Sequence, residues 1–166
     1  SMAVEMAAGE EFDVVDLSEQ VMKVATFMSS IFQERKIDFR IISLEKGLVL
    51  AQRGRLENVI KNLFMNAVEA GLPSETSIIA KVRASKEYLT LIVADTGKGI
   101  DPSNLQKVFK PFFSTKTEGS GLGLYLVHNF CEENDVRLKM RSVKGKGTVF
   151  VLTFRRQSDE AQSPCG

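Results

Sequence analysis

Cysteine and histidine are scarce in this sequence, and their scarcity excludes two kinds of structural crosslink. The 166 residues include two cysteines and one histidine. Cys131 lies in an expected helix and Cys165 in a polar tail, so a disulfide framework is not expected and a reducing cytoplasm fits. The lone histidine, His128, and two scattered cysteines provide no zinc-site spacing.

The sequence also lacks a charge excess and a long apolar run. Lys and Arg number 22 against 21 Asp and Glu, a net charge of +1, which gives no basis for a nucleic-acid partner or an anionic membrane surface. The apolar runs are strand-sized, too short to span a bilayer, and no signal peptide is visible. We therefore expect one cytoplasmic globular domain with its own core. A membrane anchor elsewhere in a longer parent protein is compatible with this.

The spacing of apolar residues predicts an α+β fold. Asp16 and Glu19 form an expected capping box at the start of the first helix. The segment 89–95 is apolar on both faces, which favours a central strand. Two groups of helices and paired strands indicate a two-layer sandwich, with a mixed, mostly antiparallel sheet packed on three helices. The expected helices span about 17–35, 53–70 and 122–133, and the expected strands 12–17, 37–42, 48–52, 77–84, 89–95, 136–142 and 147–154.

The second expected helix carries two asparagines in the segment NLFMNAVEA. Asparagine is a poor helix former because its amide competes for backbone hydrogen bonds. Asn62 and Asn66 are four residues apart, so they share one face of the helix, at the edge of its apolar stripe. Two asparagines at this place can bind a ligand or can simply be solvent-exposed polar residues of the helix surface. Neighbouring motifs decide between the two interpretations.

Glycine-rich turns follow the central strand. Asp95 ends that strand in DTGKGI, where Gly97 and Gly99 would let the backbone approach a ligand closely. In EGSGLGLYLV, Gly119, Gly121 and Gly123 precede a helix whose first N–H groups could bind phosphate. The spacing is neither a P-loop nor a dinucleotide fingerprint.

A long loop, 97–121, connects these two glycine motifs, with a short helical piece expected at 103–108. A loop of this length in a compact domain is usually a lid or a binding loop. Phe109, Phe112 and Phe113 are expected to form one small hydrophobic cluster that pins it.

The order of these four motifs resembles the N, G1, F and G2 boxes of sensor histidine kinases. The resemblance is to their catalytic ATP-binding domain, a member of the GHKL superfamily shared with gyrase-type ATPases, and it covers about 12–154. It implies a Bergerat ATP-binding fold with an ATP lid. NAVEA together with FFSTK is similar to the nitrogen-regulator branch.

The resemblance implies a site for ATP and Mg²⁺. Asn62 and Asn66 would be the catalytic residues, with Asn66 as the metal ligand and Asn62 on a phosphate or a metal-bound water. Asp95 would accept the adenine amino group. The full implied nucleotide-binding set is Asn62, Asn66, Asp95, Gly97, Gly99, Lys116, Gly119, Gly121, Leu122, Gly123 and Thr148.

Two positions bear on the reaction. Many kinases of this family have a basic residue where this chain has Glu69, and Lys116 in the lid is a candidate replacement. Gyrase-type ATPases carry a glutamate where this chain has Asn62, and an amide cannot act as a general base. The resemblance therefore implies a kinase that holds ATP without hydrolysing it efficiently.

The resemblance also implies partners outside this sequence. The family phosphorylates a histidine on a separate dimerisation hairpin, and a response regulator accepts the phosphoryl group later. His128 lies in a helix and is expected to be structural, so the isolated domain is expected to be a monomer that binds no nucleic acid. We expect a flexible linker at 1–11, the catalytic domain at 12–155 and a disordered tail at 156–166. The alternatives are a GHKL ATPase, an anti-sigma-type serine kinase or a non-catalytic binding module.

Overall fold

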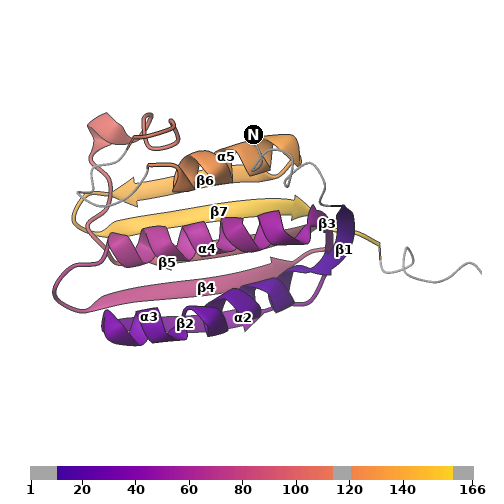
Figure 1. Cartoon of the computed structure of the whole chain (residues 1–166), viewed down its shortest axis with the longest axis horizontal. Coiled ribbons are helices and arrows are strands. Elements are labelled where there is room, and N and C mark those ends of the chain that lie inside the picture. Colours follow the sequence, from indigo (N-terminus) through magenta and orange to yellow (C-terminus); the bar gives the residue numbers. More distant parts are fainter. Residues whose placement is uncertain (1–10, 114–120, 159–166) are drawn as a thin grey trace, which may run out of the picture.

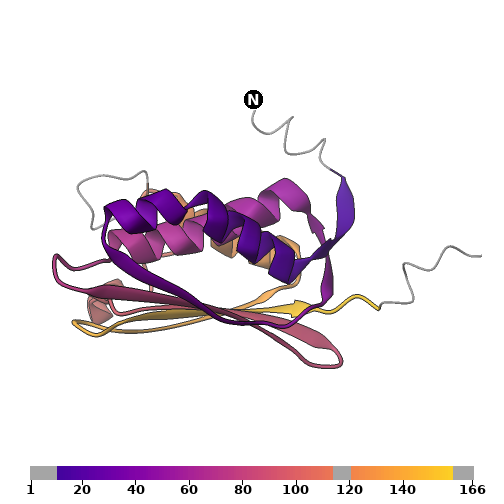
Figure 2. The same cartoon turned by 90° about the horizontal axis from the view of Figure 1, so that it is seen from below.

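The computed structural model describes residues 11–113 and 121–158, which form two layers. Figures 1 and 2 show the helices on one face of a twisted sheet, while the opposite face carries no helix. This arrangement confirms the predicted α+β sandwich. The elements in chain order are β1 Phe12–Asp16, α2 Leu17–Phe27, α3 Ser29–Glu34, β2 Ile37–Leu44, β3 Leu48–Gln52, α4 Arg53–Glu69, β4 Thr76–Ala84, β5 Tyr88–Asp95, η1 Pro102–Asn104, α5 Gly123–Glu133, β6 Arg137–Val143 and β7 Gly147–Arg155.

The main sheet has the strand order β2-β4-β5-β7-β6, so β5 is central as predicted. β2 and β4 are parallel, and the other three pairs are antiparallel. β1 and β3 form a separate antiparallel pair. β5 therefore has neighbours on both sides, and its last residue, Asp95, lies in the middle of one end of the sheet.

The core lies between the sheet and the helices. On α4, the predicted stripe of Leu56, Val59, Ile60, Leu63 and Ala67 is buried. It packs against alternate residues of the strands, which point to the same side of the sheet because side chains alternate along a strand. Burial of this stripe fixes the rotation of α4, and therefore the direction of the residues at the edge of the stripe.

Two helical predictions need correction. The helix expected over 17–35 is two helices, because the backbone leaves helical geometry at Met28 (φ −92°, ψ 1°). There the Ser29 hydroxyl donates to the carbonyl of Thr26 at 2.8 Å, a side-chain bond that competes with helix geometry. The helical piece expected at 103–108 is a single 3-10 turn at Pro102–Asn104 that begins with proline.

The folded part continues past β7. The backbone N–H of Arg156 donates to Glu87, and that of Gln157 donates to Leu48 at 2.7 Å. Gln157 also forms an isolated bridge with Leu48.

In the described part of the chain, no helix is both long and apolar enough to cross a membrane.

Candidate functional site

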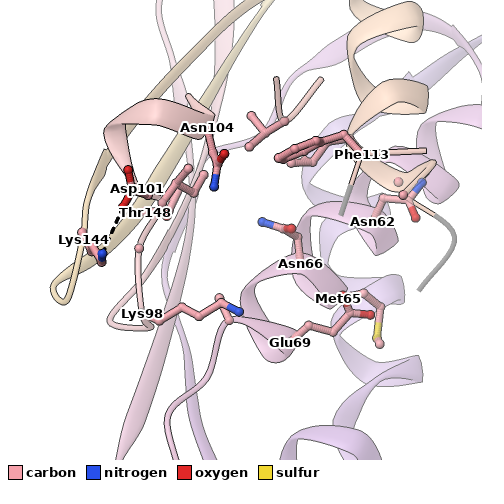
Figure 3. Close-up of a pocket in the computed structure, with 17 residues that line it drawn as sticks. Asn62, Met65, Asn66, Glu69, Lys98, Asp101, Asn104, Phe113, Lys144 and Thr148 are labelled. Carbon is pink, nitrogen blue, oxygen red and sulfur yellow. Dashed lines mark hydrogen bonds and ion pairs between the residues drawn. The ribbon is translucent and has the colours of Figure 1, made fainter. Parts of the chain in front are cut away.

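A cavity of about 430 Å³ lies between α4, the loop after β5 and the start of α5 (Figure 3). This is within the usual range for a small-molecule site. Six of the predicted site residues line it: Asn62, Asn66, Gly99, Gly121, Gly123 and Thr148. The structure thus brings together motifs that lie up to 86 positions apart in the sequence, from Asn62 to Thr148.

Both asparagines come from α4. They are partly buried, at the edge of its core stripe as predicted. Asn66 points into the cavity in Figure 3. Asn62 lies against the start of α5, since a Cβ on Gly123 would be 3.5 Å from the Asn62 side-chain oxygen. The Asn62 side-chain oxygen therefore lies beside the wall formed by the second glycine motif, and the Asn66 amide lies in the same cavity.

The end of the sheet forms the deep wall next to this cavity. Asp95 is 8% exposed, and one of its carboxylate oxygens accepts the backbone N–H of Gly97 at 2.8 Å. Its direct partner across the β5–β7 pair is Thr148, whose hydroxyl lies 2.8 Å from that of Ser142. Asp95 and Gly97 do not line the cavity. They lie next to Thr148, which does line it, at the same end of the sheet.

The backbone at Gly97 and Gly99, in the first glycine motif, passes so close to neighbouring backbone that it leaves no room for a side chain. A Cβ on Gly97 would lie 2.4 Å from the carbonyl oxygen of Ala70, and one on Gly99 would lie 2.1 Å from that of Val143. Gly99 also has a positive φ of +68°, a conformation that glycine adopts at little cost. The turn after β5 is therefore clamped between the end of α4 and the β6–β7 turn.

The second glycine motif closes the cavity at the start of α5. Gly121 has φ +71°, and its carbonyl accepts the N–H of Phe112 at 3.1 Å. Leu122 precedes the helix, and in the described structure no side chain caps this N-terminus. The first N–H groups of a helix lack intrahelical partners, so this end can accept an anion. Lys116 and Gly119 lie outside the described residues.

Several residues of the cavity were not predicted as site residues. Lys98, Asp101, Asn104 and Lys144 line it together with the acidic Glu69. Lys98 is inside the DTGKGI motif itself, and Asp101-Pro-Ser is a recognisable helix-start signal. Asn104 and Lys144 gave no comparable signal, because the fold of two loops brings them to the cavity.

Asp101 is held in a fixed position beside the cavity. The backbone N–H of Ser103 donates to its carboxylate at 3.0 Å, as does Lys144 Nζ at 3.0 Å. These contacts, the backbone N–H first, hold the pKa of Asp101 well below its usual range. The dashed line in Figure 3 marks the contact with Lys144, which ties the loop after β5 to the β6–β7 turn.

The three phenylalanines do not form the single cluster expected from the sequence. The Phe109 ring packs 6.5 Å from that of Phe150 and 5.8 Å from that of His128. Phe113 lines the cavity, whereas Phe112 is 77% exposed with a positive φ. The segment turns sharply at Phe112, so its rings point to three different environments.

Comparison with known proteins identifies the family. Residues 51–158 match the model of the family described as histidine kinase-, DNA gyrase B-, and HSP90-like ATPase. Sensor histidine kinase ZraS of Salmonella typhimurium is 35% identical over 150 residues, which cover 87% of this chain and 32% of the relative. Sporulation kinase C of Bacillus subtilis is 28% identical, covering 89% of this chain and 35% of that protein. The chain thus spans about a third of the length of these curated relatives.

Solved structures agree with the sequence matches. The nucleotide-free catalytic domain of histidine kinase ThkA superposes with a TM-score of 0.78 at 26% identity, over 88% of this chain and 98% of that one. Full-length ShkA in complex with AMPPNP has the same fold, with a TM-score of 0.77 at 24% identity, over 89% of this chain and 32% of that one. This chain therefore belongs to the family of histidine kinase-, DNA gyrase B- and HSP90-like ATPases and has the fold of a histidine kinase catalytic domain.

Proposed function

We propose that this chain binds Mg²⁺-ATP and is the catalytic domain of a sensor histidine kinase. The observation that carries the proposal is the cavity itself: Asn62 and Asn66 face the glycine turns across it, and Thr148 and Asp95 lie side by side at the sheet end. The matches to sensor kinases support it. The finer assignment to a nitrogen-regulator-like branch rests on the two sequence motifs alone.

The sheet end would hold the base. An ionised carboxylate only accepts hydrogen bonds, so Asp95 selects a ligand group that donates, such as the adenine amino group. Its burial strengthens this selection, because a hydrogen bond is electrostatically stronger in a low-dielectric site than in water. Thr148 and Gly97 would support the same edge of the base, and Gly99 would let the turn pass close to it.

The α4 side would hold the phosphates and the metal. Mg²⁺ prefers oxygen ligands and typically combines one or two protein ligands with substrate phosphates and waters. Asn66 offers such an oxygen inside the cavity, and Asn62 lies one turn away. Among the described residues, no group of three or more His, Cys, Asp or Glu could hold a metal ion. A metal held between Asn66 and the nucleotide would neutralise phosphate charge when bound.

The start of α5 would complete the phosphate site. Gly121 and Gly123 leave its first N–H groups accessible, and Leu122 would lie beside the ligand. Gly119 and Lys116 stay candidates for the lid, as inferred from the sequence. Lys98 is a further candidate for the positive charge missing at Glu69, since both line the cavity and Figure 3 shows Lys98 extending toward the Glu69 side.

The residues favour phosphoryl transfer to a protein over hydrolysis. Asn62 cannot take a proton from water, and such a site works mainly by positioning and charge neutralisation. The acceptor would be a histidine on a dimerisation hairpin elsewhere in a longer protein, with a response regulator downstream. The isolated domain, which would begin near residue 12 and include Arg156 and Gln157, would be a monomer in the cytoplasm. A GHKL ATPase or an anti-sigma-type serine kinase is the second candidate.

Two measurements in one sample test this function: the melting shift caused by Mg²⁺-ATP, and phosphate release at saturating Mg²⁺-ATP. We expect a melting shift, because a ligand that binds only the folded state stabilises it, with almost no phosphate release. Rapid release that Asn66→Ala abolishes would mean an ATPase. The absence of any shift would contradict nucleotide binding and favour a non-catalytic module.

A further inference from the structure

The face of the main sheet opposite the helices carries a concentrated positive charge. Figure 2 shows that no helix covers this face. Residues of the strands that alternate with the buried core positions point toward it. Among the described strand residues on this face, Asp38 is the only acidic one, and it pairs with Arg40 at 2.9 Å. The basic ones are Arg40, Lys81, Arg83, Arg137, Lys139, Arg141 and Arg155.

The strand register places six of these cations in two groups on either side of β5 and β7, which we call columns. One column is Arg137, Lys139 and Arg141 of β6, and the other is Arg83 and Lys81 of β4 with Arg40 of β2. Lys139 of β6 pairs with Val151, which pairs with Ile92, which pairs with Lys81 of β4. In the same way, Arg137 lies in one row with Arg83, and Arg141 in one row with Arg40. The rows of Arg137 and Lys139 reach a cation on β4, whereas the row of Arg141 passes Ile79 of β4 and reaches Arg40 on β2, one strand further out.

The residues between the columns are uncharged and short. They form a floor of partly buried side chains below the long lysine and arginine side chains. We call this floor with its two columns the basic trough. The floor consists of Ile79, Thr90, Ile92, Ala94, Val149, Val151 and Thr153.

Five of the column cations have no ion-pair or hydrogen-bond partner among the residues that the structure describes; they are Lys81, Arg83, Arg137, Lys139 and Arg141. The whole sequence has a net charge of only +1, so this face is a segregated positive surface. An apolar centre with a charged rim is the usual anatomy of a protein interface, and the rim charges select an acidic partner.

The dimensions of the basic trough fit a helix. β4 and β6 are three strand spacings apart, or about 14 Å, and an α-helix with its side chains is about 10–12 Å wide. Three alternate residues extend the β6 column over about 13 Å, the length of roughly nine helical residues. The opposite column moves outward from β4 to β2 at Arg40, so the basic trough is wider at that end. We propose that the basic trough binds an acidic amphipathic helix of a protein partner, with its apolar stripe on the floor and carboxylates on both flanks.

Other polyanions fit the basic trough less well. Proteins that bind single-stranded nucleic acid stack bases on several aromatic side chains. Among the described strand residues on this face the only aromatic one is Tyr88, which lies beside Arg155 beyond the ends of the columns. A membrane-binding surface inserts apolar side chains into the lipid, whereas these apolar residues lie below the cations. A helix with an apolar stripe and carboxylates on both sides of it can contact the floor and both columns at the same time.

The test is a fluorescence anisotropy titration of the chain with a labelled, side-chain-stapled helical peptide of about 16 residues. The peptide carries one leucine stripe flanked by glutamates, and a permuted peptide has the same composition without the stripe. We expect the striped peptide to bind more tightly than the permuted one. The double variant Lys139→Glu with Arg141→Glu should bind it about tenfold more weakly.

The matched control reverses two exposed cations away from the sheet face, Arg35→Glu with Lys46→Glu, and should leave the affinity unchanged. The neutral pair Lys139→Gln with Arg141→Gln serves if the reversal unfolds the chain, which a melting curve detects. No binding of the striped peptide, or equal losses in the control, would overturn the proposal. Tighter binding to phosphatidylserine vesicles or oligothymidine, weakened by the same reversal, would assign the face to a membrane or a nucleic acid instead.

Discussion

Gly99 and Gly145 give a matched test of the turn that positions the cavity. Both have a φ in the left-handed region, +68° and +81°, where a side chain costs about 1–2 kcal/mol. A Cβ on Gly99 would meet the Val143 carbonyl oxygen at 2.1 Å, whereas one on Gly145 would meet nothing within 4 Å. Gly99→Ala should therefore lower the free energy of unfolding by at least about 2 kcal/mol more than Gly145→Ala. Urea denaturation measures both, and equal losses would contradict the close approach.

Cys131 gives a second prediction for a single residue. Burial raises the pKa of its thiol from 9.0 to about 12, so the folded state holds the proton more tightly than the unfolded state does. The contribution of this thiol to the free energy of unfolding is fully present below the pKa that Cys131 has in the unfolded chain. It is lost as the pH rises from about 9 toward 12. In a Cys165→Ser variant at pH about 8, Cys131 should resist a thiol reagent such as DTNB until denaturant is added, because the thiolate is the reactive form. Full labelling of the native protein would contradict its burial.

The individual residues of the site were predictable to different degrees. Asn62, Asn66 and Asp95 could be identified because a short pattern fixes where each lies: a helix face for the first two and a strand end for the third. Asn104 and Lys144 could not be identified, since the path of a loop decides which of its side chains reach the cavity. The ring of Phe112 shows the same limit, because a positive φ of +63° turned the segment and separated it from Phe109.

At the scale of elements, α4 offers a matched pair of asparagines. Asn66 points into the cavity, and Asn58 is exposed on the same helix. Replacing either with alanine raises helix propensity, and a melting curve of each variant checks that the fold is retained. Asn66→Ala should weaken ATP binding in the presence of Mg²⁺ at least about tenfold by removing an oxygen ligand, and Asn58→Ala should not change it. Calorimetric titrations with and without Mg²⁺ measure this. Equal affinity of both variants would contradict a metal-binding role for Asn66.

The elements themselves were largely predictable, but their pairing was less so. Apolar periodicity identified the three helical segments and the seven strands, since burial on one face leaves a regular pattern. The β4–β5 hairpin followed from its short connection. The parallel pairing of β2 with β4 could not be predicted in this way. β3 and α4 lie between the two strands in the sequence, and a local pattern carries no information on strand partners so far apart. The separate pair of β1 and β3 was missed for the same reason.

At the scale of the whole molecule, the two faces of the sheet have separate uses. The helix-covered face forms the core and, at one end, the cavity. The open face carries the basic trough. Its positive charge does not appear in the net charge of the sequence, which is +1 because acidic residues elsewhere balance it. Net charge alone therefore gave no basis for a nucleic-acid partner or an anionic membrane surface, and the strand register was needed to find the segregated charge.

The last prediction concerns where the phosphoryl group goes. His128 is 40% exposed, but it lines a second cavity with Cys131 and Phe109, not the one formed by Asn62 and Asn66. The Phe109 ring packs against its imidazole, and Glu132 lies 3.4 Å away. A nucleotide in the first cavity would therefore have no histidine of this chain, within the described residues, beside its γ-phosphoryl group.

We accordingly expect no labelling when the isolated chain is incubated with γ-labelled ATP and Mg²⁺. Adding the proposed acceptor, a helical dimerisation hairpin that carries the phosphorylated histidine, should transfer the label from ATP to that hairpin as an acid-labile, alkali-stable phosphohistidine. His128→Gln should transfer at the same rate as the natural chain, because a histidine outside the cavity contributes no reacting atom. Autolabelling that disappears in His128→Gln would show that His128 reaches the nucleotide and would contradict its structural role.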